Sequence, residues 1–172
     1  MKTEKGEMTM ATKQSVWIPL LIISACFLGF GAQAEAQSPL EKALIGTWRL
    51  VSIEKVQETG EVIRPDDWMG KHPTGVIIYD SSGYMSLQIM RDPRPIWKSD
   101  ALWDVLEGYY AYFGTYEVNE NKGTVTHHVQ GSFKPDEVGE NYNPWLKISG
   151  NRLMLTNAAL QRFTYERVEK GK

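Results

Sequence analysis

The sequence predicts an all-β protein, an eight-stranded up-and-down antiparallel barrel with one short helix at the barrel mouth. Three observations support this fold class. Short runs of alternating apolar and polar residues fill almost all of the chain after residue 43. Turn residues separate these runs at short intervals. Closure of sequential antiparallel strands removes exposed sheet edges, and eight strands suffice for a closed barrel.

Eight runs are predicted to be strands. They span residues 43–56, 74–80, 84–91, 109–118, 123–130, 145–149, 152–156 and 161–168. Residues 80–83 form a turn with Asp first and Gly last, as type I turns prefer. Gly150 and Asn151 make a two-residue loop that suits a primed hairpin turn.

One helix is predicted, over residues 100–107. Ser99 can cap its N-terminus and Gly108 can end it. Its apolar face would pack against the barrel or cover the barrel mouth as a lid, and one helix could do both.

The first third of the chain has the pattern of a secretory signal peptide. Lysines within residues 1–14 precede an uncharged, largely apolar run over residues 15–30, which is shorter than the ~20 apolar residues of a membrane span. Small residues then alternate, so cleavage after Ala34 or Ala36 fits. Residues 1–36 are therefore predicted to be a signal peptide, and residues 37–172 one barrel domain that is periplasmic or secreted.

Two alternatives remain for this leader. It could stay uncleaved as an N-terminal anchor. Residues 23–26, Ile-Ser-Ala-Cys, also resemble a bacterial lipobox, in which Cys26 would be lipidated. The only membrane contact expected is this possible lipid anchor.

The composition excludes several other classes. Hydrophobic residues make up 42% and charged residues 23% of the chain, which suits a packed domain. A net charge of −2 gives no basic stripe for nucleic acid. The single cysteine leaves no disulfide framework, and no motif for a cofactor or for a nucleophilic enzyme is present. Nothing favours one oligomeric state.

Several motifs in order carry a family resemblance. Gly46-Thr47-Trp48 opens the first strand, and Arg167 lies near the end of the last. This Gly-x-Trp opening with a late Arg resembles the lipocalin signature. With the segments 74–79, 83–86, 112–116 and 125–129, the chain is similar to the bacterial and fungal lipocalin-like domain family over about residues 43–168. The resemblance implies a barrel around a pocket, with Gly46, Trp48 and Arg167 at its floor and the guanidinium across the indole.

Two adjacent histidines lie on the predicted strand 123–130. Neighbouring strand residues point to opposite faces, so His127 and His128 cannot share one pocket. We assign His127 inward and His128 outward. His127 is then either a neutral histidine bound to a tyrosine or backbone partner, or an acid/base. A metal site would need His72 or an acid from elsewhere, and none is predicted.

The remaining pocket candidates lie on the third and fourth strands. Parity alone leaves the inward face of residues 109–118 open. We favour Tyr110, Tyr112 and Tyr116 as wall residues, with Gly114 leaving space for a ligand or for Trp48. Arg91 shares a face with three apolar residues and either points inward or lies solvated past the strand end. The predicted ligand-binding residues are Tyr110, Tyr112, His127, Met85, Leu87, Ile89 and Arg91.

The expected function is to bind a small hydrophobic or aromatic ligand in a mainly apolar pocket with a few hydroxyl groups. No cofactor is expected, and binding is favoured over catalysis. One alternative is a cofactor-free isomerase, cyclase or hydro-lyase that uses His127 and Tyr112 as acid and base. Another is a structural envelope protein whose barrel is filled with side chains.

Overall fold

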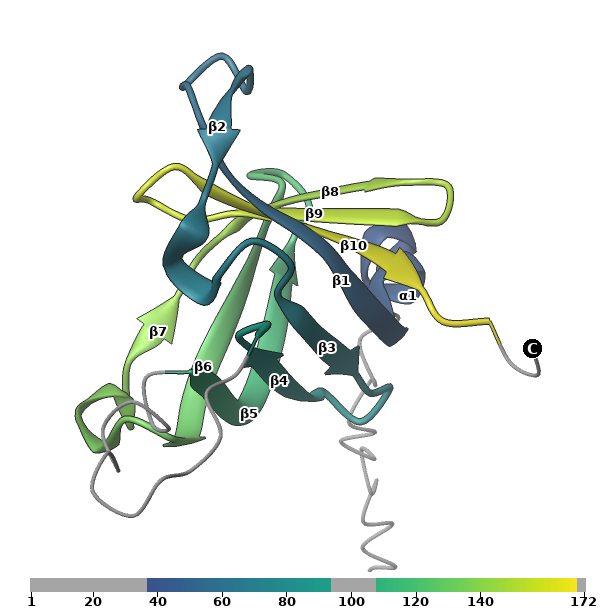
Figure 1. The fold of residues 1–172 in the computed structure, drawn as a ribbon. Helices are drawn as coiled ribbons and strands as arrows, with labels where there is room; N and C mark the ends of the chain where they lie inside the picture. Colours follow the sequence, from purple (N-terminus) through teal and green to yellow (C-terminus); the bar gives the residue numbers. More distant parts are fainter. Residues whose placement is uncertain (1–36, 94–107, 170–172) are drawn as a thin grey trace, which may run out of the picture. The chain divides into compact units, whose positions relative to one another are not determined.

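The computed structural model describes residues 37–93 and 108–169, and Figure 1 shows their fold. Within these residues, ten strands form one antiparallel sheet. The strands are β1 (Gly46–Val56), β2 (Val62–Pro65), β3 (Thr74–Tyr79), β4 (Tyr84–Met90), β5 (Tyr109–Asn119), β6 (Thr124–Ser132), β7 (Asn141–Tyr142), β8 (Trp145–Ser149), β9 (Arg152–Thr156) and β10 (Gln161–Arg167). The helices are α1 (Pro39–Leu44) and the 3-10 helices η1 (Asp67–Met69) and η2 (Pro135–Glu137). The helix predicted over residues 100–107 lies outside the described residues.

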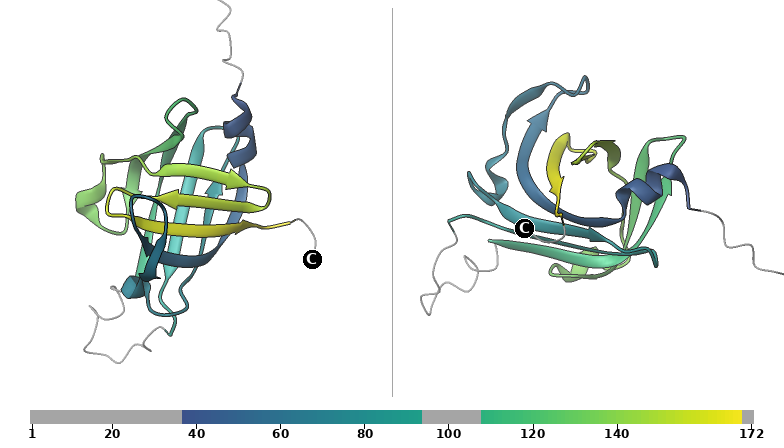
Figure 2. Two further views of the ribbon diagram at one scale, coloured as in Figure 1. Left: turned by 90° about the horizontal axis from the view of Figure 1, so that it is seen from above. Right: turned by 90° about the vertical axis from the view of Figure 1, so that its right-hand side faces the viewer.

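Strand β1 closes the sheet into a barrel, because it pairs with β3 on one side and with β10 on the other. The β1–β10 pairing runs from Trp48 opposite Arg167 to Lys55 opposite Gln161. Around the ring the order is β10-β9-β8-β6-β5-β4-β3-β1. Each of these eight strands overlaps one of the eight predicted ranges, with β5 ending one residue and β6 two residues beyond its range. The predicted all-β, eight-stranded antiparallel barrel is therefore confirmed. Figure 2 shows β8, β9 and β10 crossing the strands β3 to β6 at a steep angle.

The two 3-10 helices have no counterpart in the sequence-based prediction, and neither do β2, β7 and α1. β2 pairs with β1 outside the ring and exposes all four residues, so it lacks the alternation that indicates a strand. β7 is only two residues long and pairs with β6. α1 is short, yet its start follows ordinary capping rules: the Ser38 hydroxyl accepts from the Glu41 backbone N–H at 3.1 Å, and Pro39 occupies the first turn.

Alternation along the strands builds the interior. On β4, Met85, Leu87 and Ile89 are buried while the residues between them are at least partly exposed. The turn before β4 forms as predicted, because Asp80 accepts from the Ser82 backbone N–H at 2.8 Å and Gly83 has φ of +85°.

The barrel wall is least regular between β6 and β8. These two strands pair only at Thr124 opposite Trp145, after which β7 takes over, with Tyr142 opposite His127. Pro144, next to the junction, has no backbone N–H to donate to a ladder. The wall beside His127 is therefore formed by the chain segment before β8 rather than by a full strand.

Gly114 lies at a shift of register between β5 and β6. A Cβ atom there would lie 1.8 Å from the His128 carbonyl oxygen. The expectation that Gly114 leaves space for a ligand or for Trp48 is therefore wrong: the missing side chain makes room for the neighbouring backbone, and Gly114 is not part of the cavity lining described below.

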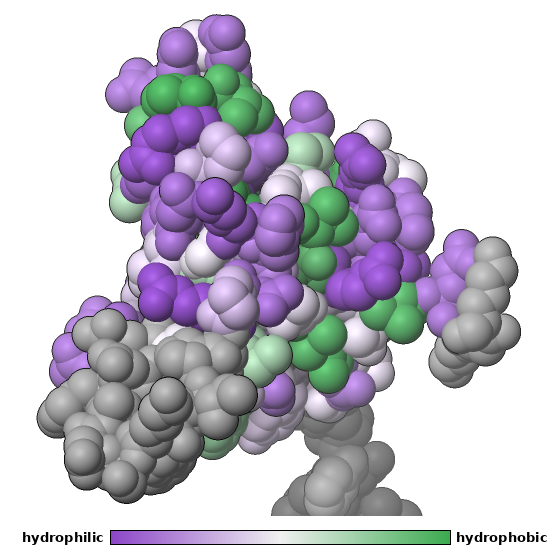
Figure 3. Space-filling view, in the orientation of Figure 1, coloured by the Kyte–Doolittle hydropathy of each residue, from purple (hydrophilic) through white to green (hydrophobic). Residues whose placement is uncertain are grey.

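The outer face in the view of Figure 3 is mostly hydrophilic. Apolar residues gather at the projection that carries β2, where Val62 and Ile63 are exposed.

Candidate ligand-binding site

One end of the barrel is closed by the residues that the resemblance places at the floor. The Arg167 guanidinium lies 4.0 Å from the centroid of the Trp48 ring, and the indole N–H donates to the Leu44 carbonyl at 2.8 Å. Arg167 also donates to the carbonyls of Ala43 and Ile45, at the end of α1. A Cβ atom on Gly46 would lie 2.6 Å from Arg167 Nη1, so only glycine fits beside the guanidinium.

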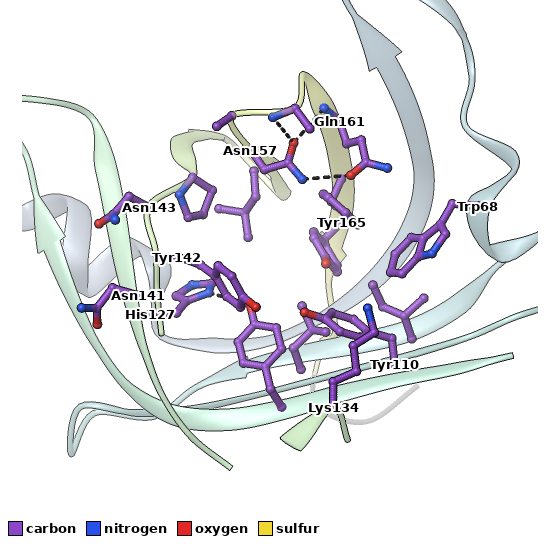
Figure 4. Close-up of a pocket in the computed structure, with 18 residues that line it drawn as sticks. Trp68, Tyr110, His127, Lys134, Asn141, Tyr142, Asn143, Asn157, Gln161 and Tyr165 are labelled. Carbon is purple, nitrogen blue, oxygen red and sulfur yellow. Dashed lines mark hydrogen bonds between the residues drawn. The ribbon is translucent and has the colours of Figure 1, made fainter. Parts of the chain in front are cut away.

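A cavity of about 490 Å³ lies inside the barrel. It is bounded by β4, β5, β6 and β10, by the segment before β8 and by the β9–β10 loop, as Figure 4 shows. The barrel is therefore not filled with side chains. The lining comprises Trp68, Leu87, Ile89, Tyr110, Tyr112, His127, Lys134, Asn141, Tyr142, Asn143, Pro144, Leu155, Asn157, Ala158, Ala159, Gln161, Phe163 and Tyr165.

His127 sits between two tyrosine hydroxyls. Its Nε2 lies 2.7 Å from the Tyr79 oxygen and its Nδ1 lies 2.7 Å from the Tyr112 oxygen. The imidazole is 1% exposed and faces the interior, while His128 on the opposite face is partly exposed. Desolvation by burial, with a contribution from His128, lowers the pKa of His127 to about 3, so the ring is neutral at neutral pH.

The interior tyrosines are also neutral. Burial, followed by neighbouring tyrosines, raises the pKa of Tyr79 and of Tyr112 well above the ordinary value. Burial raises the pKa of Tyr165 as well. A neutral imidazole between neutral phenols is equipped to give and accept hydrogen bonds; proton transfer near neutral pH would need pKa values closer to 7.

Tyr165 is fully buried, and its hydroxyl has no hydrogen-bond partner among the described residues. Its place on β10, opposite Leu50 on β1 and Leu153 on β9, directs the side chain inward. Figure 4 shows its ring beside the cavity, with Tyr110 and Tyr142 on the other side.

A carboxylate anchors one side of the cavity. Glu137 Oε2 accepts from the Tyr110 hydroxyl at 3.1 Å and from the Ser132 hydroxyl at 2.8 Å. Lys134 Nζ lies 3.6 Å from Glu137 Oε1 and 5.4 Å from the centroid of the Tyr110 ring. Lys134 is therefore paired within the protein.

A second carboxylate holds the opposite wall. Asp66 is 7% exposed, and its two oxygens accept from the Trp68 backbone N–H at 3.1 Å and from Gln161 Nε2 at 2.9 Å. Gln161 Oε1 accepts from Asn157 Nδ2 at 3.0 Å, as the dashed line in Figure 4 marks. The amides on this wall are thus fixed by protein partners.

The structure brings five of the seven predicted ligand-binding residues to the cavity: Leu87, Ile89, Tyr110, Tyr112 and His127. Met85 and Arg91 do not line it. Met85 is buried in the core on the same face of β4. Arg91 lies one residue past β4, partly exposed, and its backbone N–H donates to the Gly108 carbonyl. Tyr116 points inward, but its hydroxyl donates to the Asp80 carbonyl at 2.9 Å.

Sequence reasoning missed other lining residues, among them Trp68, Tyr142 and Tyr165. For Tyr165 a signal existed, because it has the same strand parity as Arg167, which the resemblance places inside. Trp68 and Tyr142 lie on η1 and β7, which the alternation does not reveal.

Within residues 37–93 and 108–169, no group of three or more His, Cys, Asp or Glu side chains could hold a metal ion. The same residues contain no helix long and apolar enough to cross a membrane.

The fold and the cavity together define a closed antiparallel β-barrel with a ligand-sized interior. The chain belongs to the lipocalin-like domain family, whose model matches residues 45–170. No curated protein matches it in sequence.

Solved structures that are similar to this chain include a lipoprotein and a DUF4847 family protein. The lipoprotein YedD from Klebsiella pneumoniae subsp. pneumoniae is 14% identical over 75% of this chain and 74% of that chain, with a TM-score of 0.37. A DUF4847 family protein from Bacteroides vulgatus is 12% identical over 74% of this chain and 96% of that chain, with a TM-score of 0.41.

Proposed function

We propose that this protein is exported and binds a small hydrophobic or aromatic molecule inside its barrel. The observation that carries the proposal is the cavity of about 490 Å³, which aliphatic and aromatic side chains line together with a few polar groups. Drug-sized ligands occupy cavities of roughly 300–1,000 Å³ with this kind of lining.

The first experiment is native mass spectrometry of the protein purified from its own host, followed by thermal-shift screening against a library of apolar and aromatic compounds. We expect a co-purifying small molecule or a saturable rise in Tm. Absence of both would contradict the proposal.

A blocking variant locates the binding site. Leu87→Trp places an indole in the cavity, so calorimetry should show binding weakened by at least about tenfold, since displaced contacts are worth more than ~1.4 kcal/mol. Lys147→Trp adds the same indole at an exposed position of β8 outside the lining and should bind as the parent does. Equal affinities for the two variants would place binding elsewhere.

The contact of 2.7 Å between Tyr112 and His127 is the observation that favours the alternative of a cofactor-free isomerase, cyclase or hydro-lyase. The shifted pKa values of both groups favour binding instead. Deuterium exchange separates the two. If the protein catalyses exchange at the α-carbon of an enolisable apolar ketone in D₂O, and His127→Gln abolishes it, the enzyme reading holds; exchange no faster than in buffer supports binding alone.

Export is tested by the N-terminus of the mature protein. The proposed signal peptide predicts a chain that begins at Glu35 or Gln37 in the soluble exported fraction. Replacement of Cys26 by Ala should then change nothing. A lipid-modified N-terminus at Cys26, lost in Cys26→Ala, would show a membrane-anchored lipoprotein instead.

A further inference from the structure

The inner wall of the cavity contains an unpaired hydroxyl. Tyr165 is 0% exposed, lines the cavity, and has no hydrogen-bond partner for its hydroxyl within the described residues. A buried hydroxyl without a partner is costly, and phenylalanine would fill nearly the same volume without that cost.

The proton of a second hydroxyl, that of Tyr112, is free to donate to a ligand, and the hydrogen bonds of His127 explain why. Neutral imidazole has one N–H donor and one bare acceptor nitrogen, so one of its two tyrosine partners donates to it and the other accepts from it. Tyr79 is 1% exposed, does not line the cavity, and has His127 as the only hydrogen-bond partner of its hydroxyl among the described residues.

The arrangement that satisfies Tyr79 leaves a proton at Tyr112. If Tyr79 donates to Nε2, its buried proton is paired and the imidazole N–H is at Nδ1, which donates to the Tyr112 oxygen. The Tyr112 proton then has no acceptor in the described part of the protein, and Tyr112 lines the cavity. The reverse tautomer would leave the Tyr79 proton unpaired in the core.

The two tyrosines line the same cavity. Tyr165 is also the largest contributor after burial to the raised pKa of Tyr112. The lining residues near them carry no fixed positive charge: Lys134 is the one charged residue among the described lining residues, and it is half-exposed and paired with Glu137. An anion at the two hydroxyls would therefore be buried without a counter-charge.

We propose that the ligand presents a neutral carbonyl oxygen to the hydroxyls of Tyr112 and Tyr165, and that it is an apolar ketone, quinone or ester. A carbonyl oxygen has two lone pairs and can accept from both hydroxyls. This inference rests on the proposed binding function and specifies the chemical class of its ligand.

The test compares two probes of nearly the same shape, 9-fluorenone and fluorene, by calorimetry on the purified protein. Fluorenone should bind at least about fivefold more tightly, the effect of one to two net hydrogen bonds. Tyr165→Phe should remove most of that preference while fluorene binding stays unchanged. Because the lost hydroxyl is unpaired, this variant should also be more stable than the parent without ligand. Tyr84→Phe, at an exposed position outside the cavity, is the matched control.

Infrared spectroscopy gives an independent readout. The carbonyl stretch of bound fluorenone should lie at lower wavenumber than in hydrocarbon solvent, and it should move back up in Tyr165→Phe and in Tyr112→Phe. The ¹⁵N shifts of His127 should show the proton at Nδ1, and a proton at Nε2 would remove Tyr112 from the pair and overturn the proposal.

The remaining outcomes separate this inference from the proposed function. If both probes bind equally and Tyr165→Phe has no effect, the carbonyl site is refuted while the binding function stands. If 9-fluorenone-2-carboxylate binds much more tightly than fluorenone and Tyr165→Phe abolishes that gain, the site takes an anion and the proposal is wrong. If neither probe nor any compound of the apolar library binds, the proposed function fails and this inference fails with it.

Discussion

Burial of His127 should make the stability of the barrel depend on pH. The imidazole is 1% exposed, and its two nitrogens contact neutral tyrosine hydroxyls, so burial disfavours the charged imidazolium in the folded protein. Burial lowers the pKa of His127 from 6.5 to about 3 in the folded state. The unfolded chain therefore takes up a proton below pH 6.5 that the folded protein takes up only near pH 3.

The magnitude follows from the two pKa values. The stabilisation is fully present above pH 6.5 and is lost progressively as the pH falls from 6.5 to about 3. Between pH 7 and pH 5 the free energy of unfolding should fall by about 2 kcal/mol from this group alone, and by about 5 kcal/mol once the folded state is also protonated. The loss by pH 5 is nearly independent of how far the folded pKa lies below 4.

Urea denaturation at pH 7 and pH 5 measures the effect. His127→Gln should show a difference between the two pH values that is about 2 kcal/mol smaller than in the parent, because glutamine does not titrate. His128→Gln, on the opposite face of β6, is the control and should keep the parent difference. If His127→Gln is too unstable to measure, the imidazole NMR resonances of the parent serve instead and should not move between pH 7 and pH 5. A His127 resonance that titrates near pH 6.5 would refute the reasoning.

The closed end and the β5–β6 register each give a further prediction. Arg167→Met should lower the free energy of unfolding by about 2–3 kcal/mol, since it removes the stacking on Trp48 and leaves two carbonyls without donors. The control is Arg152→Met, which removes an exposed ion pair. It should lower the free energy of unfolding by less than about 0.5 kcal/mol in the same urea assay. Gly114→Ala should cost at least about 2 kcal/mol because its Cβ would overlap backbone. Gly123→Asn, at φ of +61° where a Cβ would make only an ordinary contact with the Leu146 carbonyl oxygen at 3.9 Å, should cost less than about 1 kcal/mol. A Gly114→Ala effect as small as that would show that β6 can move away.

The strands were predictable because burial on one face of a sheet imposes a period of two on the sequence. Met85, Leu87 and Ile89 show it on β4, and the same parity correctly places His127 inside. Parity gives the face of the sheet but not the depth along the barrel. Met85 therefore shares a face with Leu87 and yet lies outside the cavity, and Arg91 lies past the end of the strand.

The cavity itself depends on contacts between residues far apart in the sequence. Tyr79 lies 48 residues before its partner His127, and no local pattern joins them. The wall at Tyr142 exists because β8 leaves β6 after a single pair, which alternation along either strand does not reveal. The closed end was accessible only through the family resemblance, since no periodicity joins Gly46 and Trp48 to Arg167, which lies more than 100 residues further along the chain.

Polar atoms at the closed end of the barrel have hydrogen-bond partners in the protein, whereas one in the cavity has none among the described residues. This difference is an argument for function. At the closed end, the Trp48 indole N–H and the Arg167 guanidinium both donate hydrogen bonds to backbone carbonyls of the described residues. In the cavity, Tyr165 keeps a hydroxyl that pairs with nothing there, although phenylalanine would fit the same position on β10. A buried polar group without a partner needs an explanation, and a ligand that completes the pairing is one such explanation. If Tyr165→Phe raises the Tm of the ligand-free protein and weakens binding of the ketone, the unpaired hydroxyl is a binding group that costs stability; a fall in Tm would show instead that the hydroxyl already has a partner in the folded protein.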